Sequence, residues 1–340
     1  MKTLVLEQPG QLRLTNMTPP EDPGPDEALV RVKCVGICGT DLHAFRGEQP
    51  FFEYPRILGH ELGVEIIDLG SSAQRSTLAA GDRCAVEPYL NCRRCGACLR
   101  GKPNCCQNLK VIGVHLDGGM REYTTLPISK LHKSLTLPFE NLALVEMLCV
   151  ARHAVCRAEL RPGEQVLVIG AGPIGLSVIE FACLADANVI VMEVSDHRLQ
   201  FCREQLKMRR VIDAKVDPLP QLQAFLSDDL PTTVFEATGN RASMITSFRY
   251  VASGGKLIFV GFVQGDITFD SAESHRREMT LLDSRNATAE DFAQVLRTLE
   301  EEKIDLAPWI THRASPEEAV TQFPRWLDPT NNVIKAMLYL

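Results

Sequence analysis

The spacing of apolar residues changes near the middle of the chain. Before residue 150, short apolar runs such as 28–35 and 62–69 are separated by Gly and Pro, a pattern typical of brief strands joined by turns. From about Arg161 onward, apolar runs of strand length (165–169) alternate with segments of helix length (174–185). This alternation is typical of βαβ units around a parallel sheet. The sequence therefore predicts an α/β protein in which a doubly wound domain follows a β-rich domain.

With 340 residues, the chain is long enough for two domains that each bury a core. The last strand of the doubly wound part is expected near 279–282. The amphipathic segment 289–301 and the tail 332–340 are too short for a third domain, so they are expected to return to the first. The predicted division is 1–150, 151–285 and 286–340.

Charge and hydropathy exclude several classes of function. The 36 Lys and Arg residues are outnumbered by 43 Asp and Glu residues, and the net charge of −7 has the wrong sign for a nucleic-acid binder. The sequence has no apolar run near the roughly 20 residues of a membrane-spanning helix. Its first residues lack the long apolar stretch of a secretory signal. We expect a cytoplasmic protein that acts on a small molecule.

Five of the twelve cysteines lie within fifteen residues, and four of them have the spacing C-x2-C-x2-C-x7-C: Cys92, Cys95, Cys98 and Cys106. The fifth, Cys105, is the weaker candidate for the fourth ligand. In a long chain without a secretory signal, this clustering favours a metal site over disulfides. Four thiolates in a tetrahedron suit a structural zinc ion, and they leave no open position for a reactant. We predict a closed zinc site here. An iron–sulfur cluster, which also uses four cysteines, is the weaker alternative.

A second set of metal-binding residue types is spread over the first domain: Cys38, the adjacent His60 and Glu61, and Glu146. One thiolate, one imidazole and one or two carboxylates form the mixed ligand set typical of catalytic zinc, in which water or substrate takes the remaining position. Each of these residues alone is more often structural. Together with the cysteine loop they suggest a second, open zinc site.

A nucleotide-binding fingerprint, G-x-G-x-x-G, follows the apolar run 165–169. Its residues are Gly170, Gly172, Pro173, Ile174 and Gly175. The first glycine allows a tight turn, the second admits a pyrophosphate, and the third lets a helix pack closely on the strand. Glu193 closes the next apolar strand, where a carboxylate accepts hydrogen bonds from the ribose and repels a 2′-phosphate. The sequence therefore predicts NAD, and the nearby Arg198 keeps NADP as an alternative.

Taken together, these motifs resemble those of the zinc-containing medium-chain dehydrogenases, the family of alcohol, sorbitol and threonine dehydrogenases, along nearly the whole chain. The motifs that appear in family order are Gly59-His60-Glu61, the cysteine loop 92–106, Asp117-Gly118-Gly119 and the Gly170 fingerprint. The resemblance implies a GroES-like catalytic domain and a Rossmann NAD-binding domain. It also implies a homodimer or homotetramer formed through the edge of the Rossmann sheet near 279–282.

By this resemblance, Cys38, His60 and Glu61 are ligands of a catalytic zinc, and Glu146 is a further ligand that comes and goes as substrate enters. Whether Glu61 or a water completes the sphere stays open. Each chain would hold two zinc ions, one catalytic and one structural. The catalytic ion would act as a Lewis acid on a substrate hydroxyl while a hydride passes to NAD.

The proton released by such a reaction needs a route to solvent. Thr40 and His43 are expected to relay it, because a hydroxyl and an imidazole can each accept and donate a proton. Two structural interpretations stand beside this one. Thr40 is also suited to cap a helix that begins at Asp41, and His43 to lie on a helix surface.

Within the family, segments 49–52, 113–119 and 284–288 are similar to those of bacterial sugar-acid dehydrogenases that act at carbon 5 of L-galactonate or L-gulonate. The guanidinium of Arg285 would bind a substrate carboxylate, although a surface salt bridge is nearly as good an interpretation. His115 is expected either to contact substrate hydroxyls or to be satisfied by the backbone. Phe51 and Phe52 are each suited to the pocket wall or to the core, and we expect one of them in each place.

We therefore expect a zinc-dependent, NAD-linked enzyme that oxidises a secondary alcohol of a sugar acid to a ketone. A sorbitol-type or L-threonine-type substrate is the alternative, and Arg285 discriminates between them because a neutral polyol does not need a guanidinium. A third interpretation is an NAD-binding regulatory protein without turnover. That interpretation predicts a damaged zinc site, whereas Cys38, His60 and Glu61 are all present.

Overall fold

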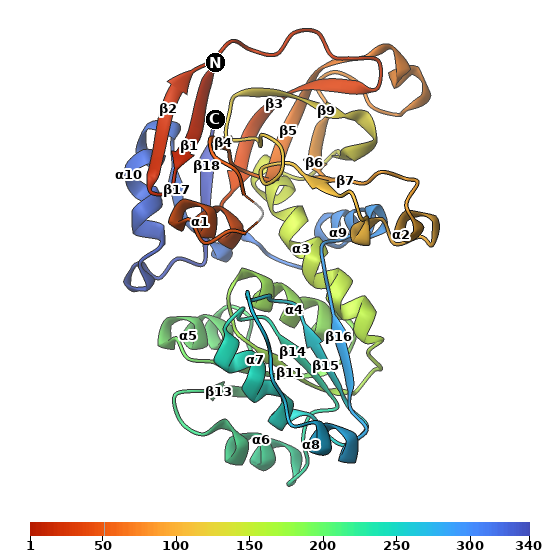
Figure 1. Ribbon diagram of the computed structural model, residues 1–340, viewed down its shortest axis with the longest axis vertical. Coiled ribbons are helices and arrows are strands. Elements are labelled where there is room, and N and C mark those ends of the chain that lie inside the picture. The colour runs from red at the N-terminus through yellow and green to blue at the C-terminus, as the bar shows by residue number, and fades with distance from the viewer. Residues whose placement is uncertain (51) are drawn as a thin grey trace. The chain divides into compact units, whose positions relative to one another are not determined.

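The computed structural model describes residues 1–50 and 52–340, and it separates into two compact units (Figure 1). The first unit comprises Met1–Glu146 and Ala287–Leu340, and the second comprises Met147–Asn286. The division after Glu146 falls inside helix α3 (Phe139–Ala158), whereas the sequence placed it at residue 150. Among the described residues there is no helix long and apolar enough to cross a membrane.

The first unit is built around a seven-stranded sheet in the order β10-β6-β5-β3-β18-β17, in which β9 also pairs with β3. Side chains of β3 alternate between buried and partly buried positions along most of the strand, as expected when only one face packs on the core. The remaining strands form a three-stranded sheet (β2-β1-β4) and a two-stranded sheet (β7-β8). The strands of this unit are β1 Lys2–Gln8, β2 Gln11–Asn16, β3 Glu27–Gly36, β4 Arg56–Ile57, β5 Glu61–Leu69, β6 Arg83–Val86, β7 Tyr89–Leu90, β8 Lys110–Val111, β9 Tyr123–Pro127, β10 Leu131–Ser134, β17 Ile310–Ala314 and β18 Lys335–Tyr339.

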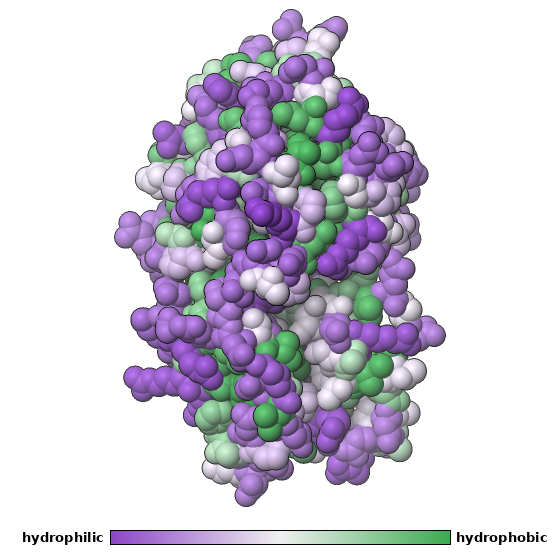
Figure 2. All heavy atoms as spheres, turned by 90° about the vertical axis from the view of Figure 1, so that its left-hand side faces the viewer, coloured by the Kyte–Doolittle hydropathy of each residue, from purple (hydrophilic) through white to green (hydrophobic). Residues whose placement is uncertain are grey.

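Short helices complete the first unit and cover its core. Helix α10 buries Ala319, Phe323 and Trp326, which share one face because they are four and three residues apart. The Phe323 ring lies 5.4 Å from that of Phe45 on α1. On the face of the molecule drawn in Figure 2, hydrophilic side chains surround several separate hydrophobic groups. Besides the start of α3, the helices are α1 Gly39–Arg46, α2 Gly96–Leu99, α9 Ala289–Glu300 and α10 Pro316–Trp326, with the 3₁₀ helices η1 Ser71–Arg75, η2 Pro103–Cys105, η3 Ile128–Lys130, η5 Ala307–Trp309 and η6 Pro329–Asn331.

The second unit contains a six-stranded parallel sheet in the order β13-β12-β11-β14-β15-β16. The predicted doubly wound α/β class is confirmed. Four consecutive residues of β11 are buried, as expected for a parallel strand covered on both faces. The strands are β11 Gln165–Ile169, β12 Asn188–Glu193, β13 Val211–Asp213, β14 Thr233–Glu236, β15 Lys256–Phe259 and β16 Thr280–Asp283.

In Figure 1 the helices of the second unit surround its sheet. They are α4 Pro173–Leu184, α5 Asp196–Glu204, α6 Pro218–Leu226, α7 Arg241–Ser247 and α8 Ser271–Arg276, with the 3₁₀ helix η4 Phe248–Tyr250 and the later part of α3. Because β11 pairs in parallel with β12 and β14, the carboxyl ends of these three strands lie at one edge of the sheet. In sheets of this kind, ligands bind at that edge.

Candidate active site

The four cysteines predicted to bind zinc converge. The sulfur atoms of Cys92, Cys95, Cys98 and Cys106 all lie within 4.8 Å of one another. The Cys95 sulfur is 3.6 Å from that of Cys98 and 3.9 Å from that of Cys106. Four sulfurs placed tetrahedrally about 2.3 Å from one zinc ion would be about 3.8 Å apart. The observed spacing therefore fits a closed zinc site.

The backbone around the cysteine loop supports the same interpretation. The loop lies between β7 and β8, which pair in an antiparallel manner and close its base. Hydrogen bonds from the backbone N–H groups of Arg94 and Cys95 lower the pKa of Cys92 to about 6. These donors favour the thiolate form of Cys92, which is the form that binds a metal. At Cys106, a backbone hydrogen bond from Cys92 lowers the pKa, but burial and the neighbouring thiols of Cys92 and Cys98 outweigh it and raise the pKa to about 11.

Three residues of the second predicted set converge at one end of the sheet of the first unit, and Glu146 is not among them. Candidate ligand atoms of Cys38, His60 and Glu61 lie within 4.8 Å of one another. Strands β3 and β5 are antiparallel and bring Gly36 opposite Glu61, and Cys38 follows two residues after Gly36. A Cβ atom at Gly36 would lie 2.0 Å from Oε2 of Glu61, so this carboxylate fits only because the residue opposite it is glycine.

A buried carboxylate lies close to the ring of His60. The imidazole is buried, and its Nδ1 has no hydrogen-bond partner among the described residues but lies 3.8 Å from Oδ1 of Asp41. Asp41 is itself fully buried and accepts hydrogen bonds from the backbone N–H groups of Cys38 (2.9 Å) and Gly59 (3.3 Å). Histidine ligands of metals characteristically direct their outer nitrogen toward a carboxylate. The donor atoms of this site therefore fit a zinc ion.

The site also attracts positive charge. Burial alone would lower the pKa of His60, but the neighbouring Cys38 and Asp41 outweigh it and raise that pKa well above its ordinary value. Burial raises the pKa of Asp41 and of Glu146. Buried acidic groups around one imidazole favour a cation among them, whether that cation is a proton or a metal ion, because it offsets the cost of ionising them.

The two candidate carboxylate ligands have different partners. Both oxygens of Glu61 accept hydrogen bonds from the ammonium group of Lys335, at 2.7 and 2.6 Å, and Lys335 also donates to the carbonyl of Ile37 at 3.1 Å. Glu146, from α3, accepts a hydrogen bond from the hydroxyl of Tyr89 at Oε1. Sequence reasoning assigned no role to Lys335, Tyr89 or the carboxylate of Asp41.

In the second unit, the predicted fingerprint forms the turn between β11 and α4. Gly170 has a φ of +93°, which favours glycine, and the N-cap of α4 is Gly172. A Cβ at Gly175 would lie 1.8 Å from the carbonyl oxygen of Gly170, so the helix packs against the turn only with glycine here. Pro173 and Ile174 lie in the first turn of α4, which begins one residue before the predicted start at Ile174.

Glu193 ends β12 and lines a pocket of about 440 Å³ together with Gly170, Gly172 and Arg198. Its carboxylate accepts hydrogen bonds from the backbone N–H groups of Ala171 (2.7 Å), Val194 (2.6 Å) and Ser195 (2.9 Å). The guanidinium of Arg198 lies 3.8 Å from the same carboxylate. The pocket thus has the composition expected at the carboxyl edge of a nucleotide-binding sheet.

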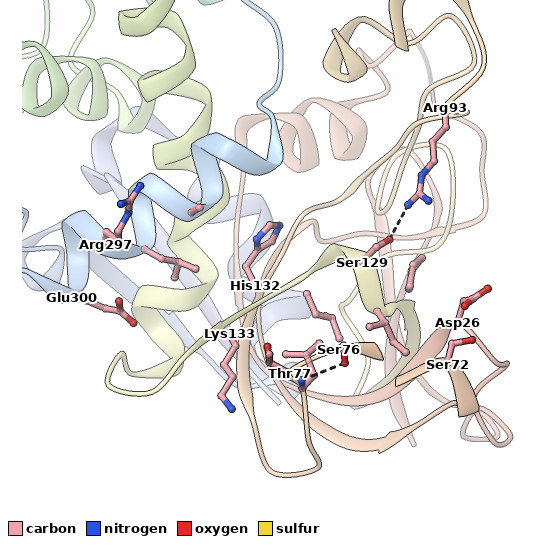
Figure 3. Close-up of a pocket in the computed structure, with 16 residues that line it drawn as sticks. Asp26, Ser72, Ser76, Thr77, Arg93, Ser129, His132, Lys133, Arg297 and Glu300 are labelled. Atoms are coloured by element: carbon pink, nitrogen blue, oxygen red, sulfur yellow. Dashed lines mark hydrogen bonds between the residues drawn. The ribbon is translucent and has the colours of Figure 1, made fainter. Parts of the chain in front are cut away.

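A larger cavity of the first unit, about 1140 Å³, is lined by none of the predicted site residues within the described chain (Figure 3). In Figure 3, Arg93 reaches Ser129, to which it donates a hydrogen bond of 3.1 Å. The cationic Arg93 and Arg297 share this cavity with the acidic Asp26 and Glu300. Its mixed charge and lack of clustered metal-binding residues distinguish it from the sites above, where we place the chemistry.

Comparison with known proteins identifies the family. Residues 24–138 match the alcohol dehydrogenase GroES-like domain, and residues 173–301 match the zinc-binding dehydrogenase domain. L-galactonate-5-dehydrogenase of Escherichia coli (strain K12) is 42% identical over 313 residues, which cover 92% of this chain and 91% of the relative. The chain belongs to the zinc-binding dehydrogenases. Its predicted class, a zinc- and nicotinamide-dependent oxidoreductase with GroES-like and Rossmann domains, is confirmed.

Solved structures with the same fold include two cofactor complexes. The alcohol dehydrogenase RspB of Escherichia coli CFT073, in complex with NADH, is 27% identical with a TM-score of 0.91, covering 100% of this chain and 99% of the other. A zinc-binding dehydrogenase of Sinorhizobium meliloti 1021, bound to NADP, is 28% identical with a TM-score of 0.91 and the same coverage. The family fold is therefore compatible with either cofactor.

The remaining predicted residues of this dehydrogenase lie as follows. Helix α1 begins at Gly39 with Cys38 as its N-cap, so the interpretation of Thr40 as the cap of a helix starting at Asp41 is wrong. His43 is exposed on α1, and its Nδ1 lies 3.2 Å from a carboxylate oxygen of Glu48.

Of the three predicted substrate contacts, the structure describes two. Nδ1 of His115 accepts a hydrogen bond from the backbone N–H of Val111 at 3.1 Å, which agrees with the backbone-satisfied interpretation of this residue. Arg285 is exposed and follows β16 in the second unit. Phe51 lies outside the described residues.

Proposed function

We propose that this dehydrogenase oxidises a secondary alcohol of a hexonate-type sugar acid to a ketone, with NAD as the hydride acceptor. The observation that carries the substrate class is the 42% identity to L-galactonate-5-dehydrogenase over 92% of the chain. The cluster of Cys38, His60 and Glu61 supports metal-assisted oxidation of an alcohol because its donor atoms fit zinc.

The catalytic zinc would be held by Cys38 and His60 together with Glu61 or Glu146, and the structural zinc by the four cysteines of the loop. Bound at the first of these sites, zinc supplies a Lewis acid that polarises the substrate hydroxyl and makes it more acidic. Asp41 would hold the His60 ring in the orientation that metal binding needs. Lys335 would hold Glu61 at the site while neutralising its charge.

The pocket of the second unit supports NAD over NADP. Glu193 is buried there, and its carboxylate would repel a 2′-phosphate. Arg198, the residue most suited to bind such a phosphate, faces the Glu193 carboxylate at 3.8 Å. RspB, a relative of the same fold, binds NADH. The glycine turn and the N-terminus of α4 would bind the pyrophosphate of the cofactor.

Oxidation of the alcohol transfers a hydride from the carbinol carbon to NAD and releases one proton. Thr40 is partly buried and lies two residues after Cys38, and His43 is exposed almost one helical turn later. A hydroxyl and an imidazole can each accept and donate a proton, so the two residues would carry it from the reaction site to solvent. The exposure of His43 supports its place at the solvent end of this route.

Arg285 is the residue proposed to bind the substrate carboxylate, and its replacement tests the substrate class. We expect Arg285→Ala to raise KM for L-galactonate by about tenfold or more, because a bidentate pair with a carboxylate is lost. Arg285→Lys keeps the charge but not the planar geometry, so it should recover only part of the loss. Arg276→Ala, which removes an exposed guanidinium that pairs with Glu273, is the matched control. An unchanged KM in Arg285→Ala would contradict the carboxylate role.

The sheet edge of the second unit supports the predicted self-association. Strand β16 ends the sheet order and pairs with β15 alone within the described chain. Leu281, at its centre, is 43% exposed. An apolar edge strand invites pairing with an identical strand of a second copy, so we infer a homodimer, or a homotetramer built from such dimers.

A further inference from the structure

Tyr89 connects the cysteine loop to the candidate catalytic site. We propose that it is a positioning residue, which fixes the carboxylate of Glu146 so that one oxygen faces the catalytic metal. The inference rests on the metal site proposed above. It assigns a task to a residue that has none in the reaction as described so far.

The contact between the two residues is direct and shielded from water. The hydroxyl of Tyr89 donates a hydrogen bond to Oε1 of Glu146, and the two residues are only 4% and 5% exposed. A hydrogen bond to an ionised group is among the stronger ones in proteins, and burial strengthens it further. With Oε1 tied in this way, Oε2 is the oxygen of Glu146 that would be left to face a metal.

Both the backbone and the ring of Tyr89 are held in place. Strand β7 pairs Tyr89 with Val111 of β8, and Cys92 begins the cysteine loop three residues later. The ring packs edge-on against Phe292, with centroids 6.5 Å apart and planes at 74°. Phe292 is fully buried and stacks on His132, with ring centroids 4.8 Å apart. Moving the Tyr89 hydroxyl would therefore disturb a packed aromatic cluster as well as the strand.

The partners of the two carboxylates explain why Glu146 needs such a residue. Glu61 has both oxygens bonded to the ammonium of Lys335, which fixes its orientation. Glu146 lies on helix α3 and receives its orienting hydrogen bond from Tyr89. Residues that orient a metal ligand typically change metal affinity by about 10- to 100-fold when they are replaced. Tyr89→Phe removes one hydroxyl and keeps the ring, so it separates this task from packing.

The chain offers a matched control on the same helix. The hydroxyl of Tyr339 donates to Oε1 of Glu140, which also belongs to α3 and lies six residues before Glu146. Tyr339→Phe therefore removes an equivalent bond between a tyrosine and a glutamate, away from the metal-binding residues. The Glu146→Gln variant and the Tyr89→Phe/Glu146→Gln double variant complete the set.

The experiment measures metal binding, with zinc and cobalt as probes on the full-length protein. Competition with a chelator counts the zinc ions per chain and gives the affinity of each site. The visible spectrum of bound cobalt distinguishes a site of four thiolates from one with mixed ligands. We expect Tyr89→Phe to weaken the mixed-ligand site by about tenfold and to alter its cobalt spectrum. Tyr339→Phe should match the wild type, and the double variant should bind no more weakly than Glu146→Gln.

Two results would overturn the inference, and they can be told apart. If Tyr89→Phe keeps the wild-type affinity and cobalt spectrum while the wild type binds two metal ions, the positioning role of Tyr89 is wrong and the proposed function stands. If the wild type binds only the ion held by four thiolates, the catalytic metal site is wrong as well.

Discussion

Replacing Lys335 with Met should destabilise the first unit by about 3–5 kcal/mol, the usual cost of removing one partner from a buried ion pair. The structure supports the upper part of this range. Lys335 and Glu61 are each 1% exposed, and both oxygens of Glu61 accept hydrogen bonds from the ammonium. In the metal-free protein, the variant would leave a carboxylate buried without its cation, beside a methionine of similar length. Removing both charges, in Glu61→Gln/Lys335→Met, should recover most of the loss.

Tryptophan fluorescence reports this change selectively, because the only two tryptophans of the sequence, Trp309 and Trp326, belong to the first unit and are buried there. With an m-value of about 2 kcal/mol/M, a loss of 3–5 kcal/mol lowers the urea midpoint by about 1.5–2.5 M. Lys2→Met is the control, because Lys2 pairs with Glu317 at an exposed position and should leave the midpoint unchanged.

The double variant decides whether the reasoning about charge is right. If Glu61→Gln/Lys335→Met unfolds at the same urea concentration as Lys335→Met, the cost comes from lost packing and not from an uncompensated carboxylate. If Lys335→Met itself unfolds like the wild type, the buried pair contributes nothing measurable.

Three further predictions concern other parts of the chain. Glu193→Ser should raise the ratio of kcat/KM for NADP to that for NAD by at least about tenfold, because it removes the carboxylate that repels a 2′-phosphate. Steady-state kinetics with both cofactors measure this ratio, and an unchanged ratio would contradict the role of Glu193. Burial alone would raise the pKa of Glu87, but His132 and a neighbouring lysine outweigh it and lower that pKa below its ordinary value of 4.5. Ionised Glu87 therefore stabilises the fold at neutral pH, and this contribution is lost as the pH falls below 4.5. Glu87→Gln should therefore show a weaker loss of stability on acidification in urea titrations at several pH values, and an unchanged acid dependence would refute the assignment. Leu281→Asp should halve the mass measured by light scattering if β16 is the dimer contact, and a wild-type mass would place the contact elsewhere.

Much of the fold could be predicted where burial on both faces leaves a continuous apolar run. The run 165–169 coincides with β11, and the segment 174–185 differs from α4 by one residue at each end. Strand β13 is harder to detect because it has only three residues, one of them charged. The pattern of apolar residues changes near Arg161 and the family resemblance implies a boundary near residue 150, whereas the structure continues helix α3 through residue 150.

The residues of the candidate site also differ in how far the sequence could predict them. The cysteine loop is a local pattern, so spacing alone indicated its four ligands. Cys38 and His60 are brought together by the pairing of β3 with β5, which the motif implied only through the family. Lys335 lies 274 residues from Glu61 and reaches it because β18 pairs with β3. A lysine in an otherwise apolar strand is a signal of a buried ion pair, but its partner cannot be read from the sequence.

The most direct test of the central claim is the formation of NADH with L-galactonate, L-gulonate, sorbitol and L-threonine, each with and without a chelator. We expect turnover on a hexonate that the chelator abolishes, with little or none on sorbitol or L-threonine. Turnover only on sorbitol or L-threonine would contradict the sugar-acid substrate while leaving the dehydrogenase intact. Turnover that is insensitive to metal removal would contradict the zinc site on which the mechanism rests.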